Sequence, residues 1–238
     1  MTEMYIPIKG FCFDKDGTLF DFAATWEAWA KAFLRRAAEG CETRATLLGE
    51  AIGFDLAEGK FASDSLVIAG TAGEVTDALM PYFEHMPRAA LLEMLNEEAA
   101  RAPQQPAVPL RPLLEGFRAQ GLALGVATND AEGPALAHLG AAGVTDLFDF
   151  IAGYDSGHGG KPAPGQLLAF ASAVGLPPEQ IVMVGDSTHD LHAGRAAGMR
   201  TIGVLTGTAL AAQLAPHADV VLRDIGEIPA WLAAQARS

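Results

Sequence analysis

Two acidic residues stand two positions apart directly after an apolar stretch near the N-terminus. Residues 6–13 predict a buried strand, which runs into the sequence DKDGTL at residues 14–19. Because residues two apart along a strand face the same side, we expect Asp14 and Asp16 to converge on one ligand. Crowding raises the proton affinity of one acid, so one carboxylate can attack while its neighbour carries a proton. This geometry suits phosphate chemistry, although an Asp- and Gly-rich turn can also simply close a loop.

Two further polar sites follow in the middle of the chain. A second apolar run, residues 122–127, ends in Thr128 and Asn129, where a parallel strand would lead into a helix. Thr and Asn are common helix caps, so this pair alone is weak evidence. Lys161 lies in a loop stiffened by two prolines, just before a helical segment at residues 166–174. A cation fixed in this way is unusual.

A third apolar run ends in two acids four residues apart. Residues 181–185 precede Asp186, and Asp190 follows. If a helix starts at Ser187, the two carboxylates lie on one helical face and can point towards the same site. The alternatives are that Asp186 caps the helix and that Asp190 faces solvent.

Taken in order, these segments resemble the haloacid dehalogenase superfamily of phosphohydrolases, and within it the phosphoglycolate phosphatase-like branch. The motifs are Asp14-x-Asp16-Gly17-Thr18-Leu19, Thr128-Asn129, Lys161-Pro162 and Gly185-Asp186-x-x-x-Asp190. The likeness to the branch rests on Thr18-Leu19-Phe20-Asp21 and on the Pro-Ala-Pro that follows Lys161. Lys15 departs from the family, whose members usually carry an apolar residue there. Its amine could touch substrate or be solvated.

The resemblance implies a magnesium-dependent phosphatase acting on a small phosphorylated metabolite, with phosphoglycolate as one candidate. Asp14 would attack phosphorus and become an aspartyl phosphate. Asp16 would protonate the leaving oxygen and then deprotonate the hydrolytic water. Asp14, the backbone carbonyl of Asp16, and Asp186 would hold Mg²⁺, which prefers hard oxygen ligands.

The resemblance also assigns the groups around the phosphoryl oxygens. Thr128, Asn129 and Lys161 would bind these oxygens, and Lys161 would also keep Asp14 ionised. Asp190 would not bind the metal or the substrate itself, but would orient Lys161 or a metal-bound water. Selectivity would come from an inserted cap: a small anionic substrate would require a cation that reaches down from the cap, for which Lys31, Arg35 and Lys60 are candidates that also suit a solvated surface.

The pattern of elements predicts an α/β fold with a Rossmann-like parallel sheet core, helices on both faces, and an inserted all-helical cap. From residue 112 onward, helical segments alternate with strands at residues 122–128, 148–153, 181–185, 201–205 and 220–222. Between residues 21 and 105 only helical periodicity is found. Helices are predicted at residues 42–52, 74–84 and 87–101, and an aromatic stripe, interpreted as packing inside the cap, comprises Phe22, Trp26, Trp29 and Phe33. We therefore predict a hydrolase core at residues 1–20 and 106–238 and a cap at residues 21–105, which closes over the site.

Composition limits the partners and the compartment. The net charge of −13 disfavours nucleic acid, because a phosphate backbone requires a cationic face. No apolar stretch reaches the length of a membrane span, and no secretory signal is evident. The two cysteines provide no disulfide framework, so we expect a cytoplasmic protein, either a monomer or a homodimer.

Several other functions share part of this pattern. A sugar phosphomutase would have the same core and differ only in returning the phosphoryl group to a sugar. A signalling module that accepts a phosphoryl group without turnover fits the acids but not the long insertion. A dehalogenase is disfavoured because its nucleophile lacks the second acid. Zinc at His189 and His192 is disfavoured because the acids suit magnesium.

Overall fold

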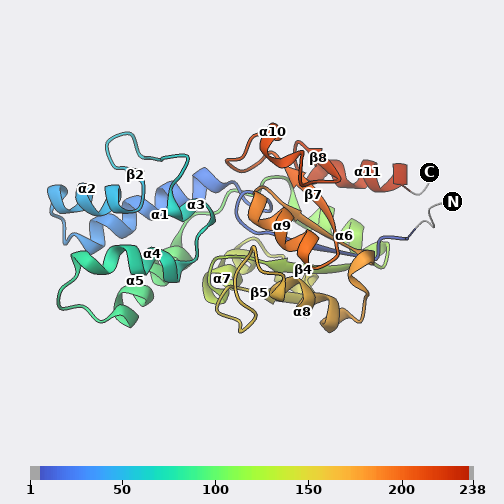
Figure 1. The fold of residues 1–238 in the computed structure, drawn as a ribbon, viewed down its shortest axis with the longest axis horizontal. Helices are drawn as coiled ribbons and strands as arrows, with labels where there is room; N and C mark the ends of the chain where they lie inside the picture. The colour runs from blue at the N-terminus through green and yellow to red at the C-terminus, as the bar shows by residue number, and fades with distance from the viewer. Residues whose placement is uncertain (1–5, 236–238) are drawn as a thin grey trace.

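The core of the protein is a parallel sheet, as the sequence predicts. The computed structural model describes residues 6–235. Six strands pair in the order β5-β4-β1-β6-β7-β8, and every pairing is parallel (Figure 1). Their bounds are β1 Gly10–Phe13, β4 Ala123–Ala127, β5 Phe150–Ala152, β6 Ile181–Gly185, β7 Arg200–Val204 and β8 Val220–Leu222. The motif-bearing strands β4, β1 and β6 are therefore immediate neighbours.

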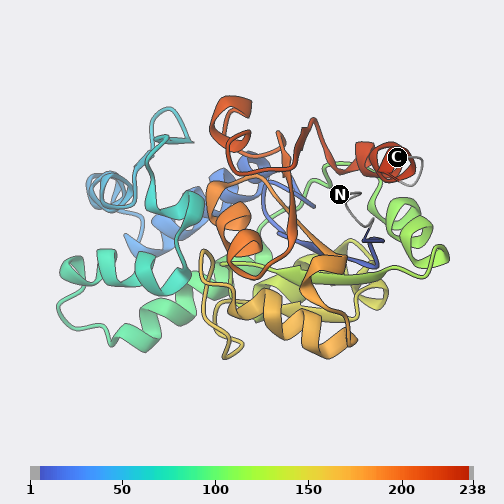
Figure 2. The same cartoon turned by 45° about the vertical axis from the view of Figure 1, so that its right-hand side comes forward.

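Helices cover both faces of this sheet (Figure 2). The helices of this part are α6 Leu110–Ala119, α7 Glu132–Ala141, α8 Gly165–Val174, α9 Thr188–Ala196, α10 Ala211–Leu214 and α11 Ile228–Gln235. Side chains of β1 alternate between the faces: Phe11 and Phe13 pack with α6, α7 and α11, whereas Cys12 packs with α8 and α9. Because β1 is buried on both faces, it reads as a continuous apolar run.

The segment between β1 and α6 has a hydrophobic core of its own. Its helices are α1 Phe22–Ala37, α2 Glu42–Ala51, α3 Leu66–Ala69, α4 Ala72–Leu79 and α5 Arg88–Arg101. The expectation of helices alone fails at one place, where β2 Phe54–Asp55 and β3 Lys60–Phe61 form an antiparallel ribbon. Strands of two residues are too short to show alternation in the sequence. We continue to propose the division into core and cap at residues 20/21 and 105/106; residues 1–5 and 236–238 lie outside the described part of the chain.

Most predicted elements fall within two residues of their observed bounds, with a few exceptions. The first strand begins at Gly10 rather than at residue 6. The helix predicted at residues 74–84 ends at Leu79 and continues as a 3₁₀ turn, Met80–Tyr82, because Pro81 interrupts it. Helices α3, α10 and α11 have no counterpart among the predicted elements. None of the helices within residues 6–235 is sufficiently long and apolar to cross a membrane.

Candidate active site

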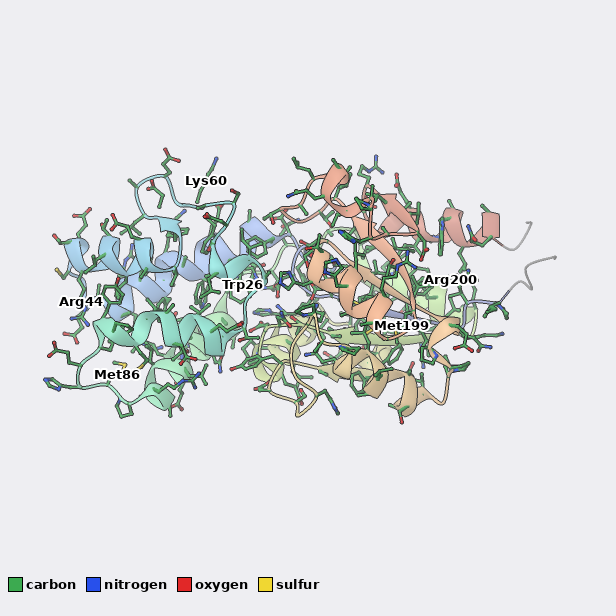
Figure 3. The ribbon with its side chains drawn as sticks, viewed as in Figure 1. Trp26, Arg44, Lys60, Met86, Met199 and Arg200 are labelled. Atoms are coloured by element: carbon green, nitrogen blue, oxygen red, sulfur yellow. The ribbon has the colours of Figure 1, made fainter. Side chains whose placement is uncertain are left out.

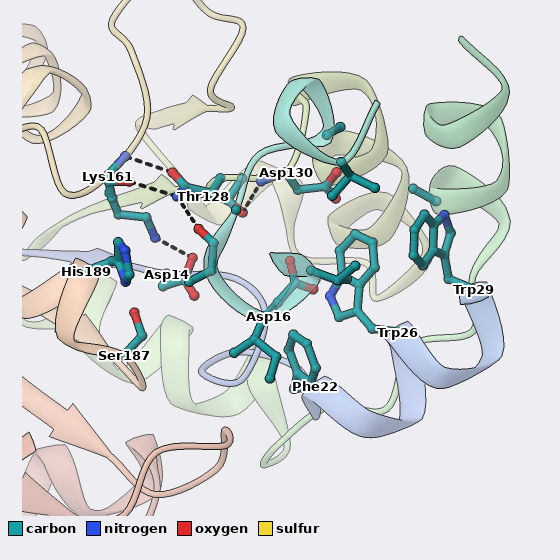
Figure 4. Close-up of a pocket in the computed structure, with 18 of the residues that line it drawn as sticks. Asp14, Asp16, Phe22, Trp26, Trp29, Thr128, Asp130, Lys161, Ser187 and His189 are labelled. Carbon is teal, nitrogen blue, oxygen red and sulfur yellow. Dashed lines mark hydrogen bonds and ion pairs between the residues drawn. The ribbon is translucent and has the colours of Figure 1, made fainter. Parts of the chain in front are cut away.

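All the predicted site residues line one pocket at the carboxyl ends of β1, β4 and β6 (Figure 4). They are Asp14, Asp16, Thr128, Asn129, Lys161, Asp186 and Asp190. The parallel register places the strand ends at one edge of the sheet, and the Asp14 amide continues the ladder by donating to the Val184 carbonyl at 2.8 Å. Ligands of open α/β sheets bind at this edge.

Lys161 is buried between two carboxylates. Its Nζ lies 2.6 Å from Asp14 Oδ1 and 2.7 Å from Asp190 Oδ1. The other oxygen of Asp190 accepts from the amide and hydroxyl of Ser187, which caps α9. The cap of α9 is therefore Ser187, not Asp186, and Asp190 does not face solvent. Burial alone would lower the pKa of Lys161, but Asp14 and Asp190 raise it above its ordinary value.

Asp186 sits in a cradle formed by two glycine backbones. A Cβ atom added to Gly17, whose φ is +76°, would lie 2.4 Å from the Asp186 Cγ. A Cβ added to Gly207 would lie 1.7 Å from Asp186 Oδ2. Only glycine at these two positions leaves room for the carboxylate.

The buried acids have the donor set that a hard divalent cation requires. Oxygens of Asp14, Asp186 and Asp190 lie within 4.8 Å of one another. Burial raises the pKa of Asp14 to about 7, despite Lys161, and burial with the neighbouring acids raises that of Asp186. One lysine does not balance the charge of three carboxylates, so the ionised forms of Asp14 and Asp186 are disfavoured. A divalent cation bound between them would neutralise this charge and favour the ionised forms. Because both oxygens of Asp190 have protein partners, Asp14 and Asp186 are the better ligands.

Thr128 and Asn129 follow β4 and fix the neighbouring loops. The Thr128 hydroxyl oxygen accepts from the Asp130 amide at 3.0 Å and keeps its own hydrogen for another acceptor. The Asn129 side-chain amide donates to the carbonyls of Lys161 and Ala69, both at 2.9 Å, and its oxygen accepts from the Lys161 amide. Asn129 therefore links the lysine loop to α3 of the cap. Phosphoryl binding by Thr128 and Asn129 stays a prediction.

Lys15 is fully buried, which excludes the solvated alternative. Its Nζ lies 2.7 Å from Asp16 Oδ1, 3.2 Å from Asp130 Oδ2 and 2.9 Å from His138 Nδ1. His138 Nε2 lies 2.7 Å from the Ala99 carbonyl in α5, so Nε2 carries the proton and Nδ1 accepts from Lys15. Burial, together with Lys15, lowers the pKa of His138 to about 4. Sequence reasoning missed Asp130 and His138, because neither belongs to a recognised motif.

The cap contributes apolar side chains to the pocket. Phe22 and Trp26 belong to the aromatic stripe, but they line the pocket, as does Trp29, which also packs in the cap core with Phe33. The prediction of one helix is therefore confirmed, whereas the prediction that the whole stripe packs inside the cap is wrong for the side chains that line the pocket. The signal in the sequence that could have identified the pocket-lining members is the short distance along the chain between the stripe and Asp16.

Most of the other candidate residues lie apart from the pocket. Lys31, Arg35 and Lys60 are exposed and do not line it. His189 lines the pocket, whereas His192 contacts His217 at 3.2 Å. Among residues 6–235 these histidines do not form a shared metal-binding group.

Two curated proteins with sequences similar to this chain carry the same name. A phosphoglycolate phosphatase of Nitrosospira multiformis is 31% identical over 206 residues, which cover 85% of each protein. A phosphoglycolate phosphatase of Rhodospirillum rubrum is 34% identical over 120 residues, half of each protein. The chain thus spans only about half the length of some curated relatives that it matches.

The fold and the family are supported independently. The crystal structure of a haloacid dehalogenase-like hydrolase from Bacteroides fragilis has a TM-score of 0.69 at 20% identity, covering 93% of this chain and 99% of that chain. The family model of haloacid dehalogenase-like hydrolases matches residues 8–198. The chain therefore belongs to the haloacid dehalogenase-like hydrolase family.

Proposed function

We propose that the protein is a phosphatase that hydrolyses a small phosphomonoester, with Mg²⁺ as cofactor and an aspartyl phosphate on Asp14 as intermediate. The observation that carries this proposal is the buried contact of Lys161 with Asp14, beside Asp186 at the end of the neighbouring strand. Phosphoryl transfer needs an in-line nucleophile, a proton carrier and positive charge around the phosphoryl oxygens. The relatives named as phosphatases support the same reaction.

Each step has a residue with a suitable environment. Lys161 opposes the effect of burial on Asp14 and so favours the ionised, nucleophilic form. Lys15 binds Asp16 Oδ1, which leaves Oδ2 to deliver a proton to the leaving oxygen and later to accept one from water. Thr128 and Lys161 stabilise the phosphoryl oxygens. Bound at Asp14, the Asp16 carbonyl and Asp186, the divalent ion would supply charge neutralisation for the phosphoryl group.

The proposal is tested by phosphate release from a panel of phosphate esters, with Mg²⁺ and with a chelator. We expect release that requires the metal, and we expect Asp14→Asn to lower kcat at least about 10³-fold while the circular dichroism spectrum is retained. The matched control is Asp64→Asn, an exposed acid of the cap, which should keep full activity. Substantial turnover by the Asp14 variant would exclude it as the nucleophile.

The same assay separates the two alternatives. A sugar phosphomutase would convert one sugar phosphate into its isomer with little release of inorganic phosphate. A signalling module would keep its aspartyl phosphate for minutes to hours without turnover, which acid-quenched phosphoprotein measurements would detect.

A further inference from the structure

The described residues on the cap side of the pocket are mainly apolar, and none of them is a lysine or arginine. The Nζ of Lys15 lies 5.7 Å from the centroid of the Trp26 ring, but Lys15 is already paired with Asp16 and Asp130. Its side chains come mainly from α1, α3, α4 and α5, and include Phe22, Trp26, Trp29, Val67, Val75 and Leu95. Among the described residues that line the pocket, Lys161 is the only lysine or arginine, and it is bound to Asp14 and Asp190. A substrate group that reaches into the cap therefore meets no free positive charge from these residues.

Two polar atoms on this side are buried and have no partner among the described residues. They are Nε1 of Trp26, a donor, and Oδ1 of Asn96, an acceptor. The neighbouring Trp29 differs, because its Nε1 donates to the Leu95 carbonyl at 3.2 Å. Figure 4 shows the Trp26 nitrogen on the edge of the ring that is turned towards Asp16. Buried polar groups are almost always paired, so a bound molecule is the natural partner for these two atoms.

Charge excludes an acidic group from the same place. Asp16, Asp130 and Asp186 also line the pocket. Lys15 is already shared between Asp16 and Asp130, and Lys161 is already bound to Asp14, so neither lysine is free to pair with another carboxylate. A carboxylate on the substrate would lose its hydration without gaining a counter-ion, which is unfavourable. An aromatic or branched aliphatic group would instead bury apolar surface against the indole rings.

We propose that the alcohol part of the substrate is uncharged and largely apolar, and that it carries a neutral polar group able to accept from Trp26 and donate to Asn96. This inference rests on the proposed phosphatase function and specifies its substrate class. It disfavours phosphoglycolate, whose only group beyond the ester carbon is a carboxylate.

Three esters test the substrate class: benzyl phosphate, 4-carboxybenzyl phosphate and phosphoglycolate. We expect kcat/KM for benzyl phosphate to exceed that for either carboxylate at least about 100-fold, since a site without a counter-ion rejects the buried charge. Phosphoglycolate turned over as well as or better than benzyl phosphate would overturn the inference and leave the phosphatase function standing. If the metal-loaded enzyme releases phosphate from none of these esters or of the wider panel, the proposed function itself fails.

A charge introduced into the pocket provides the second test. Ile68 lines the pocket from α3, whereas Leu66 of the same helix is exposed and does not line it. Ile68→Lys should raise the ratio of 4-carboxybenzyl to benzyl kcat/KM at least about tenfold, and Leu66→Lys should leave it unchanged. Equal ratios in both variants and the wild type, with the fold retained, would contradict an apolar binding site beside α3.

The unpaired donor is tested with a ligand that can accept from it. Trp26→Phe keeps an aromatic ring and removes the N–H group. We expect its KM to rise up to about tenfold for 4-(hydroxymethyl)benzyl phosphate but to change little for benzyl phosphate, which has no such acceptor. An equal rise for both esters would show that Trp26 acts through packing alone.

Discussion

At the residue scale, two buried lysines organise the carboxylates around the pocket. Lys161 contacts Asp14 and Asp190, and Lys15 contacts Asp16 and Asp130. Each pair of acids thus shares one lysine. The proposed nucleophile, Asp14, and the proposed proton carrier, Asp16, therefore contact different lysines. Lys15 has a neutral partner as well, His138, which must remain unprotonated to accept from the ammonium group.

His138 makes stability depend on pH. Its pKa is about 4 in the folded protein, against an ordinary value of 6.5, so the unfolded chain takes up the proton first as pH falls. The stabilisation is present above pH 6.5 and is lost between pH 6.5 and 4, and the difference between the two pKa values corresponds to about 3 kcal/mol. His138→Gln, whose side-chain amide keeps one donor and one acceptor but does not titrate, should remove this part of the pH dependence.

Urea unfolding at pH 7.5 and pH 5 measures the effect. The drop in unfolding free energy between these values should be smaller in His138→Gln than in the wild type. His85→Gln, at an exposed position of the cap, is the control and should keep the wild-type drop. An identical pH dependence in all three proteins would show that His138 can be protonated in the folded state.

At the element scale, close packing of helix on sheet sets the position of the loops that carry the site. Helix α8 follows the Lys161 loop and packs on β4 through Phe170. Gly125 of β4 permits this approach, because an added Cβ would lie 2.7 Å from the Phe170 ring. In α6, by contrast, a Cβ added to Gly116 would meet nothing within 4 Å.

These two glycines should respond oppositely to the same substitution. Gly125→Ala should destabilise the protein by about 1–3 kcal/mol through overpacking against Phe170. Gly116→Ala should stabilise it by about 0.4–1 kcal/mol, because alanine restricts the unfolded chain and suits a helix. Chemical denaturation at neutral pH measures both. A stabilising Gly125→Ala would mean that α8 can move away from β4 at little cost.

At the scale of the whole molecule, the cap and the core are joined by two adjacent crossings. The Asp21 amide donates to the Gln105 carbonyl at 2.8 Å, and the Ala107 amide donates to the Leu19 carbonyl at 2.9 Å. Figure 3 shows the two lobes with Trp26 on the side of the cap that faces the core. Away from the crossings, Asn129 and His138 connect the core to carbonyls of α3 and α5. The pocket therefore exists only when both lobes are together.

Metal binding should stabilise the entire fold through the acid cluster. Mg²⁺ at about 100 times its Kd should add about 2.7 kcal/mol to the unfolding free energy, since the unfolded chain lacks the site. Asp186→Asn should abolish this increase, while Asp64→Asn should retain it. Thermal unfolding with Mg²⁺ or chelator provides the measurement, and an equal increase in both variants would place the ion elsewhere.

The sequence alone determined the parallel sheet, the order of its main elements and the residues that meet at its edge. These features follow from local patterns: apolar runs that end in acids, hydroxyls and amides read as strand ends, and parallel strands bring such ends together. Asp14, Thr128 and Asp186 could be predicted for this reason, as could the helical character of the cap.

Only the tertiary structure decided what surrounds those residues. Lys15 could be read as solvated until folding buried it against Asp130 and His138, and most of the aromatic stripe could be read as cap interior until the lobes met. These outcomes depend on contacts between segments up to 123 positions apart, as for Lys15 and His138. Hydrophobic periodicity records which side of an element is buried, but it does not record which distant segment covers that side.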